Sequence, residues 1–176
     1  MLLLNKGGFQ HELGLNDSAI ATDRQCLAAM TALFGPAHMN VAVVQNNLGE
    51  VYYDKGDYKE AMKAYLASKE IFAKYWAEND PNFSASHLNI GKTEMKLGRH
   101  KRAEELLTLA LKLKQGQQGA EAEDLVEYYD CLTELYKAMG RKKDAEKYAG
   151  LGDKLRKHRN YPGSTGTILN KSATDD

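Results

Sequence analysis

Histidine and cysteine are the residues of this 176-residue chain that could hold a metal, or act as a base and a nucleophile. The five histidines lie at positions 11, 38, 87, 100 and 158. No two of them are one helical turn apart, and Cys26 and Cys131 lie too far from each other for metal-site spacing. The sequence also lacks a glycine-rich phosphate loop and a serine nucleophile elbow. We therefore predict that the protein is not an enzyme and holds no metal or cofactor.

Two other groups could carry chemistry. His87 and Cys131 would form a base and a thiol if the helices that carry them were neighbours. We favour a buried core thiol beside a packing histidine. The basic run 154–159 could meet phosphates or an acidic protein, but the helix dipole alone favours cations at the end of a helix. We interpret that run as a solvated helix end.

Asparagine amides are the third candidate. Asn5, Asn47 and Asn89 recur at an interval of 42 residues. Each amide offers both a donor and an acceptor, so a row of them could hydrogen-bond the main chain of an extended peptide. The same amides could instead satisfy the backbones of neighbouring helices, and the sequence leaves both interpretations open.

The interval of 42 residues also governs small residues. It links Gly7, Gly49 and Gly91; Gly14, Gly56, Gly98 and Gly140; and Ala19, Ala61, Ala103 and Ala145. Small residues at fixed positions allow paired helices to approach closely. We therefore predict four two-helix units, at about 1–35, 36–80, 81–119 and 120–158, of which the first is degenerate.

These units resemble the tetratricopeptide repeat. The matching positions are Leu48, Gly49, Tyr52, Ala61 and Tyr65. The period exceeds that family's usual length of about 34 residues, and the segments 38–48 and 80–89 resemble the extended repeats of kinesin light chains. The resemblance implies an all-α fold over residues 1–158, a right-handed superhelix of antiparallel helix pairs with seven or eight helices.

The resemblance also implies a concave groove lined by the first helix of each unit. By analogy it is lined by Asn5, Asn46, Asn47, Glu50, Tyr53, Asp54, Asn89, Lys92, Met95, Lys96, Asp130 and Glu134. Lys92 and Lys96 lie one turn apart and favour an acidic residue in the ligand, while Tyr53 and Met95 offer apolar contact. The third unit has acidic residues where a clamp for a C-terminal carboxylate needs Lys and Arg, so a receptor for chaperone tails is disfavoured.

The helices themselves can be placed from periodicity and capping residues. We expect them at about 1–13, 17–34, 39–55, 58–78, 84–97, 100–114, 121–139 and 141–158. Gly7 and Gly8 should fray the first helix. Ile20, Leu27, Met30, Leu33 and Phe34 recur at helical spacing in the second. The fourth should bury Ala61, Ala64, Tyr65, Ser68, Ile71, Phe72 and Tyr75, and Trp76 should pack between units.

The remaining predictions concern a loop, the ends of the last two helices and the tail. Residues 115–119 should form an exposed, mobile loop because they contain no apolar side chain. Glu121, Glu123 and Asp124 should place negative charge in the first turn of the next helix. Gly150 and Gly152 should kink or shorten the last helix. Residues 159–176 lose the period and should form a disordered tail.

Composition limits the partners. Lys plus Arg and Asp plus Glu each total 24, so the chain lacks the net positive charge that nucleic acid or an anionic membrane surface would attract. Two distant cysteines favour a reducing compartment, and we predict a cytoplasmic location. The apolar start, residues 1–4, is too short for a signal core or a membrane span and reads as a half-repeat at a fragment boundary.

Three functions remain open. The first is a non-catalytic adaptor or scaffold that binds a peptide or a partner protein in the concave groove. The second is a structural subunit of a larger assembly that self-associates through the ends of the solenoid. The third is a regulatory repeat module of a larger enzyme.

Overall fold

The computed structural model describes residues 2–118 and 124–159. These residues form eight α-helices and one short 3-10 helix, with no strand in either range. The elements are α1 (Leu2–Glu12), α2 (Asn16–Phe34), α3 (Met39–Lys55), α4 (Tyr58–Phe72), η1 (Pro81–Phe83), α5 (Ser84–Lys96), α6 (His100–Gln118), α7 (Leu125–Ala138) and α8 (Lys142–Arg159).

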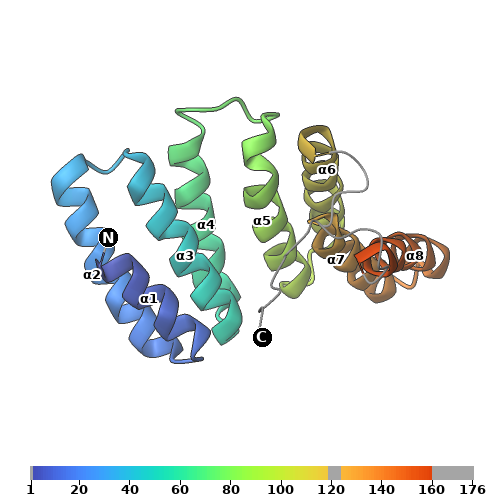
Figure 1. The fold of residues 1–176 in the computed structure, drawn as a ribbon, viewed down its shortest axis with the longest axis horizontal. Coiled ribbons are helices and arrows are strands. Elements are labelled where there is room, and N and C mark those ends of the chain that lie inside the picture. Colours follow the sequence, from blue (N-terminus) through green and yellow to red (C-terminus); the bar gives the residue numbers. More distant parts are fainter. Residues whose placement is uncertain (1, 119–123, 160–176) are drawn as a thin grey trace, which may run out of the picture.

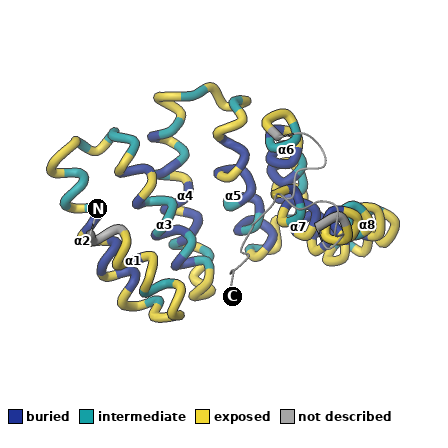
Figure 2. Tube along the Cα trace, in the orientation of Figure 1, coloured by how far each residue is buried: buried dark blue, intermediate teal, exposed yellow. Residues whose placement is uncertain are grey.

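The helices pack as antiparallel pairs that follow one another along a curved row (Figure 1). The pairs are α1 with α2, α3 with α4, α5 with α6, and α7 with α8, and the second helix of each pair also packs on the first helix of the next. The predicted all-α, right-handed superhelix is confirmed. Figure 2 shows buried residues running along α3, α4 and α5, whereas α8 at the end of the row is largely exposed.

Glycines end the first helix of each pair. Gly14, Gly56, Gly98 and Gly140 have φ angles of 72°, 85°, 76° and 70°. Because residues with a Cβ rarely adopt this left-handed conformation, glycine is the favoured residue past a helix end. In the turn between α3 and α4, the Asp57 carboxylate accepts a hydrogen bond from the Glu60 N–H at 3.4 Å and caps α4. The predicted turn at 56–57 is confirmed.

A second set of glycines lies where the two helices of a pair cross. A Cβ added to Gly49 would lie 2.5 Å from the Tyr65 ring, and a Cβ on Gly91 would lie 2.9 Å from Leu107. The predicted close-packing role of both glycines is confirmed, as is the burial of Ala61, Ala103 and Ala145 on the opposite helices. A Cβ on Gly7 would lie 2.0 Å from the Asp23 carboxylate. The predicted fraying of the first helix is not seen within the described range 2–12, where α1 runs through both Gly7 and Gly8.

Two predictions about the fourth helix are wrong. The fourth helix ends at Phe72 and not near 78, because residues 73–80 form turns and Asp80 caps η1 by accepting from the Asn82 N–H at 2.9 Å. Tyr75 is 47% exposed and Phe72 only half-buried, so the buried stripe stops at Ile71.

Trp76 folds back over the end of α4. Its ring stacks on Phe72 with centroids 5.1 Å apart and lies edge-on to Phe83 of η1 at 6.4 Å. The predicted packing of Trp76 between units is confirmed.

The predicted loop at 115–119 is wrong for residues 115–118. α6 continues to Gln118, held to the next pair by a hydrogen bond from Gln115 Nε2 to the Tyr129 hydroxyl at 3.2 Å. Asp124 precedes α7 instead of lying in its first turn, and its carboxylate pairs with Lys114 at 3.1 Å. The predicted positions 119–123 lie outside the described residues.

The last helix is continuous through Gly150 and Gly152 and spans 18 residues, so the prediction that it is short is wrong. Arg159, assigned to the tail, is the final residue of α8. The rest of the predicted tail, 160–176, lies outside the described residues.

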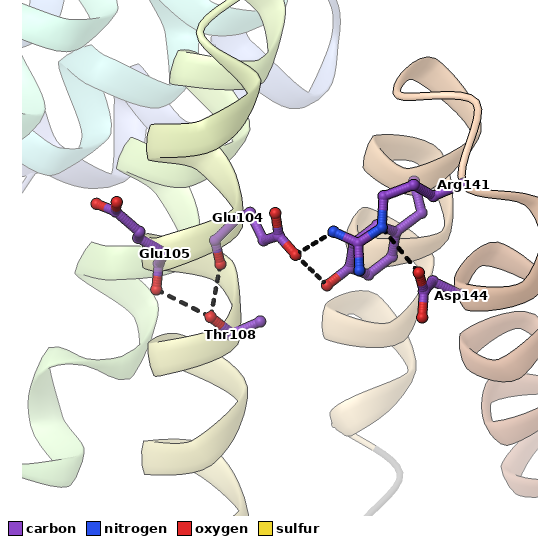
Figure 3. A network of polar contacts seen from close by, with 6 residues as sticks. Glu104, Glu105, Thr108, Arg141 and Asp144 are labelled. Atoms are coloured by element: carbon purple, nitrogen blue, oxygen red, sulfur yellow. Dashed lines mark hydrogen bonds and ion pairs between the residues drawn. The ribbon is translucent and has the colours of Figure 1, made fainter.

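A polar network joins the third pair to the fourth (Figure 3). The Glu104 carboxylate of α6 accepts hydrogen bonds from Arg141 Nη1 at 2.6 Å and from the Tyr136 hydroxyl at 2.9 Å. Arg141 also pairs with Asp144 at 2.8 Å and lies over the Tyr136 ring, 4.5 Å from its centroid. The network joins α6 to the fourth pair at the turn between α7 and α8.

Candidate functional site

A cavity of about 340 Å³ opens on the face formed by the first helices α1, α3, α5 and α7. We call it the groove cavity. Its walls are His11 of α1; Glu50, Tyr53 and Asp54 of α3; Tyr65 of α4; Ala85, Leu88, Asn89 and Lys92 of α5; and Glu127 and Tyr128 of α7. All four helix pairs therefore contribute residues to one site, as expected for a groove lined by the first helix of each unit.

Polar contacts between first helices cross the groove. His11 Nε2 lies 2.7 Å from Asp54 Oδ2, which joins α1 to α3. Asn89 Nδ2 donates to Asn46 Oδ1 at 3.3 Å, which joins α5 to α3. α3 is thus linked across unit boundaries to the first helix of the unit before it and of the unit after it.

Two lysines of α5 link it to α7. Lys92 Nζ lies 2.8 Å from Glu127, and Lys96 Nζ lies 2.7 Å from Glu134. The Lys92 ammonium also lies 5.5 Å from the centroid of the Tyr53 ring. The two lysines predicted to attract an acidic ligand are therefore already paired with glutamates of the protein.

Glu50 is the acidic residue held by amides. Asn46 Nδ2 donates to Glu50 Oε1 at 2.8 Å. Burial raises the pKa of Glu50, and the hydrogen bond from Asn46 opposes that shift. Burial also raises the pKa of Tyr53 to about 12, so its hydroxyl stays protonated at neutral pH. The site therefore contains a poorly solvated carboxyl group beside a neutral phenol.

The predicted groove residues do not all reach the cavity. Glu50, Tyr53, Asp54, Asn89 and Lys92 line it. Asn46, Lys96 and Glu134 lie beside it through the contacts described above. Asn5 is exposed on α1, Asn47 is half-buried on α3, and Asp130 pairs with Arg156 of α8. Of the three asparagines at 42-residue spacing, Asn89 alone lines the cavity.

The prediction that Met95 contacts a ligand is wrong. Its side chain is 7% exposed and belongs to the core cluster that contains Leu132, Leu135 and Tyr136. α7 packs over this part of α5, so the position is covered. In the second unit the corresponding residue, Tyr53, faces the cavity instead.

Sequence reasoning missed His11, Glu127 and Tyr128. His11 lies 42 residues before Tyr53, so the repeat interval could have identified it. Glu127 lies seven residues, or two helical turns, before Glu134, so helical spacing from that predicted residue could have identified it. The sequence offered no comparable signal for Tyr128.

The candidate nucleophile pair is not assembled. His87 Nε2 lies 3.4 Å from the Glu78 carbonyl, and burial lowers the pKa of His87. Burial raises the pKa of the Cys131 thiol to about 12, so the reactive thiolate is disfavoured. Both Cys26 and Cys131 are buried free thiols, as predicted.

Searches for other site types were limited to the described residues. Within 2–118 and 124–159, no group of three or more His, Cys, Asp or Glu side chains could hold a metal ion. In the same part of the chain, no helix is both long and apolar enough to cross a membrane.

Sequence profiles of the tetratricopeptide repeat match residues 1–74 and 84–117. The chain belongs to the tetratricopeptide repeat family. The two matches cover all or most of the first three helix pairs of this repeat protein, and the 42-residue interval extends the pattern to the fourth.

Solved structures share the fold of this tetratricopeptide repeat protein at low sequence identity. BtubC (BKLC) from P. vanneervenii has a TM-score of 0.77 at 20% identity, covering 98% of this chain and 67% of that one. A kinesin light chain protein of Podosopora anserina with nearly identical TPR-like repeats has a TM-score of 0.72 at 18% identity, covering 91% and 74%. MamA has a TM-score of 0.62 at 17% identity, covering 90% and 78%. The fold is thus shared with solved tetratricopeptide-type repeat proteins, one of which carries kinesin light chain TPR-like repeats.

One sequence relative is the RxLR effector protein SFI4 of Phytophthora infestans. It is 23% identical over 143 residues, which is 81% of this chain and 42% of that protein. The chain thus spans less than half the length of this relative.

Proposed function

We propose that the protein is a non-catalytic adaptor that binds an extended peptide segment of a partner protein in its concave, first-helix groove. The observation that carries the proposal is the groove cavity, whose walls come from all four helix pairs. Repeat proteins use such extended concave surfaces for binding. The Asn46 and Asn89 amides lie at its edge, where they could hydrogen-bond a peptide main chain.

A peptide library displayed on phage and selected against the full chain would test this function. The groove variant carries Asn89→Ala, Lys92→Glu and Lys96→Glu. The matched control carries Lys63→Glu and Lys101→Glu, which change the charge of exposed residues on the second helices α4 and α6. Circular dichroism and thermal melting establish that both variants fold.

Selected peptides should bind the groove variant at least tenfold more weakly than the wild type, and the control with unchanged affinity. Wild-type affinity in a folded groove variant would place the interaction elsewhere and favour a structural subunit.

A structural role in an assembly is the second candidate, and exposed apolar residues at the N-terminal end of the row of helices favour it. Phe9, Leu13 and Leu15 are 62%, 59% and 51% exposed on α1 and the turn after it. Apolar patches of this kind are typical of interaction sites. Self-association through this end predicts a mass above 19.6 kDa in light scattering, and a return to that mass in Phe9→Ser with Leu13→Ser.

A cytoplasmic location belongs to the same proposal, whereas the acidic partner expected from Lys92 and Lys96 does not. An acidic ligand residue would have to displace Glu127 or Glu134 from its lysine, which disfavours acidic selectivity. The buried free thiols suit a reducing compartment such as the cytoplasm. Mass spectrometry of the protein isolated from its own cells without reductant should find both thiols free, and a disulfide would contradict this location.

A further inference from the structure

The groove cavity holds more acidic than basic side chains. Glu50, Asp54 and Glu127 face a single lysine, Lys92, and His11. Lys92 is paired with Glu127, and His11 with Asp54. Among the ion pairs of residues 2–118 and 124–159, none includes Glu50, whose carboxylate is held by neutral amides. Glu50 therefore has no direct ion-pair partner among the described residues, although the charges of His11 and Lys92 act on it from a longer distance.

The surroundings of Glu50 suit a long cationic side chain. The Tyr53 ring already has one ammonium group, that of Lys92, near its face. Aromatic rings attract cations in this way, most strongly where water is displaced. Leu88, Tyr65 and Tyr128 add apolar wall to the same cavity, which a methylene stem could contact. The site thus combines a carboxylate, an aromatic face and an apolar lining.

We propose that the groove cavity binds the side chain of a lysine or arginine in the partner peptide, with Glu50 as the counter-ion. An anionic side chain would meet Glu50 and Asp54 on entry, and would reach Lys92 only by displacing Glu127. A cation entering instead gives the Glu50 carboxylate a direct ion-pair partner through a charge-assisted hydrogen bond. This inference rests on the proposed function, because it names the ligand chemistry of the same groove.

The test uses three peptides that differ only at the central residue. They are acetyl-Gly-Ser-X-Ser-Gly-amide with X as arginine, norleucine or glutamate, titrated into the isotope-labelled full chain and followed by amide chemical shifts. Norleucine keeps the apolar stem and removes the charge. Glu50→Gln keeps the side chain's size and removes its charge, and Glu105→Gln on α6 is the control, since Glu105 lies outside the cavity and is largely exposed.

The arginine peptide should shift the amides around Glu50, Tyr53 and Asn89, and should bind about tenfold more tightly than the norleucine or glutamate peptide. Glu50→Gln should remove most of that preference, and Glu105→Gln should leave it intact. Tighter binding of the glutamate peptide, or equal binding of arginine by Glu50→Gln, would overturn the proposal while leaving peptide binding in the groove standing. Shifts confined to other faces would overturn it too, and would count against the groove function only if the phage-selected peptides also bind elsewhere.

Discussion

The first and third helix pairs place side chains of opposite polarity at the point where their two helices cross. In the third pair Gly91 contacts Leu107, which is 1% exposed, and in the first pair Gly7 contacts Asp23, which is also 1% exposed. Asp23 and Leu107 are 84 residues apart, twice the repeat interval, so they are equivalent. The repeat therefore preserves how closely the helices approach, but not what stabilises them.

Burial of the Asp23 carboxylate destabilises the folded state, whereas burial of the Leu107 side chain stabilises it. Its Oδ1 atom has no hydrogen-bond partner within the described part of the chain. Burial raises the pKa of Asp23 to about 6, and the charge of His11 opposes that shift. Within the first pair a polar contact joins the two helices, in which the Thr22 hydroxyl donates to Gln10 Oε1 at 2.7 Å. We infer that the first pair is the less stable of the two.

Of the substitutions that test this comparison, Leu107→Ala should change the free energy of unfolding the most. Removing a fully buried leucine leaves a cavity and costs about 2–5 kcal/mol. Thermal and urea unfolding would measure the loss. Leu66→Ala on α4 removes the same atoms from a residue that is 49% exposed and should change stability far less. Equal effects of the two would contradict the assignment of Leu107 to the core.

Asp23→Leu should raise the free energy of unfolding, whereas Leu107→Ala should lower it. It removes the unpartnered carboxylate and places at the first crossing the residue that packs on glycine in the third pair. The expected gain in free energy of unfolding at pH 7 is about 1–3 kcal/mol. A loss of stability in the same unfolding assay would show that the first crossing has no space for an apolar side chain.

The pH dependence sharpens the comparison further. The folded pKa of Asp23, about 6, exceeds the ordinary value of 3.8, so the native state holds the proton more tightly than the unfolded state. The contribution of this group to stability therefore falls as the pH rises between about 4 and 7. The advantage of Asp23→Leu over the wild type should shrink by roughly 1 kcal/mol between pH 7 and pH 5. An advantage that stays constant or grows on acidification would be inconsistent with the raised pKa.

Arg141→Ala should have the smallest effect. It removes the partner of Glu104 at the joint between the third and fourth pairs (Figure 3). Because Arg141 is partly exposed, the loss of stability should be small and should diminish at high salt. A loss as large as that of Leu107→Ala would mean that this joint depends on the ion pair more than on the apolar contacts beside it.

Much of the fold was predictable because it depends on backbone geometry. Gly56 and Ala61 mark a left-handed turn and a close crossing, and both requirements recur with the repeat interval. The end of α4 was not predictable in the same way. Residues 73–80 carry a helix-like apolar pattern, but α4 ends at Phe72, and Trp76 packs on Phe83 of the next unit, a contact that helical periodicity does not specify.

The candidate site was predictable only in part, for a related reason. The first helices place Glu50 and Lys92 on the expected face, because helical spacing determines it. Which charges remain available depends on partners from other units. Lys92 and Lys96 are paired with glutamates 35 and 38 residues away, and Met95 is covered by α7. Such pairings depend on how the units stack, which repeat spacing does not specify.

Hydrogen exchange of the native, full-length chain at pH 7 tests the difference between the two pairs most directly. The account predicts that buried amides of α1 and α2 exchange through an opening of lower free energy than those of α5 and α6, and that Asp23→Leu raises protection in α1 and α2 selectively. Equal protection of both pairs in the wild type, or a gain spread evenly over all helices in Asp23→Leu, would contradict it.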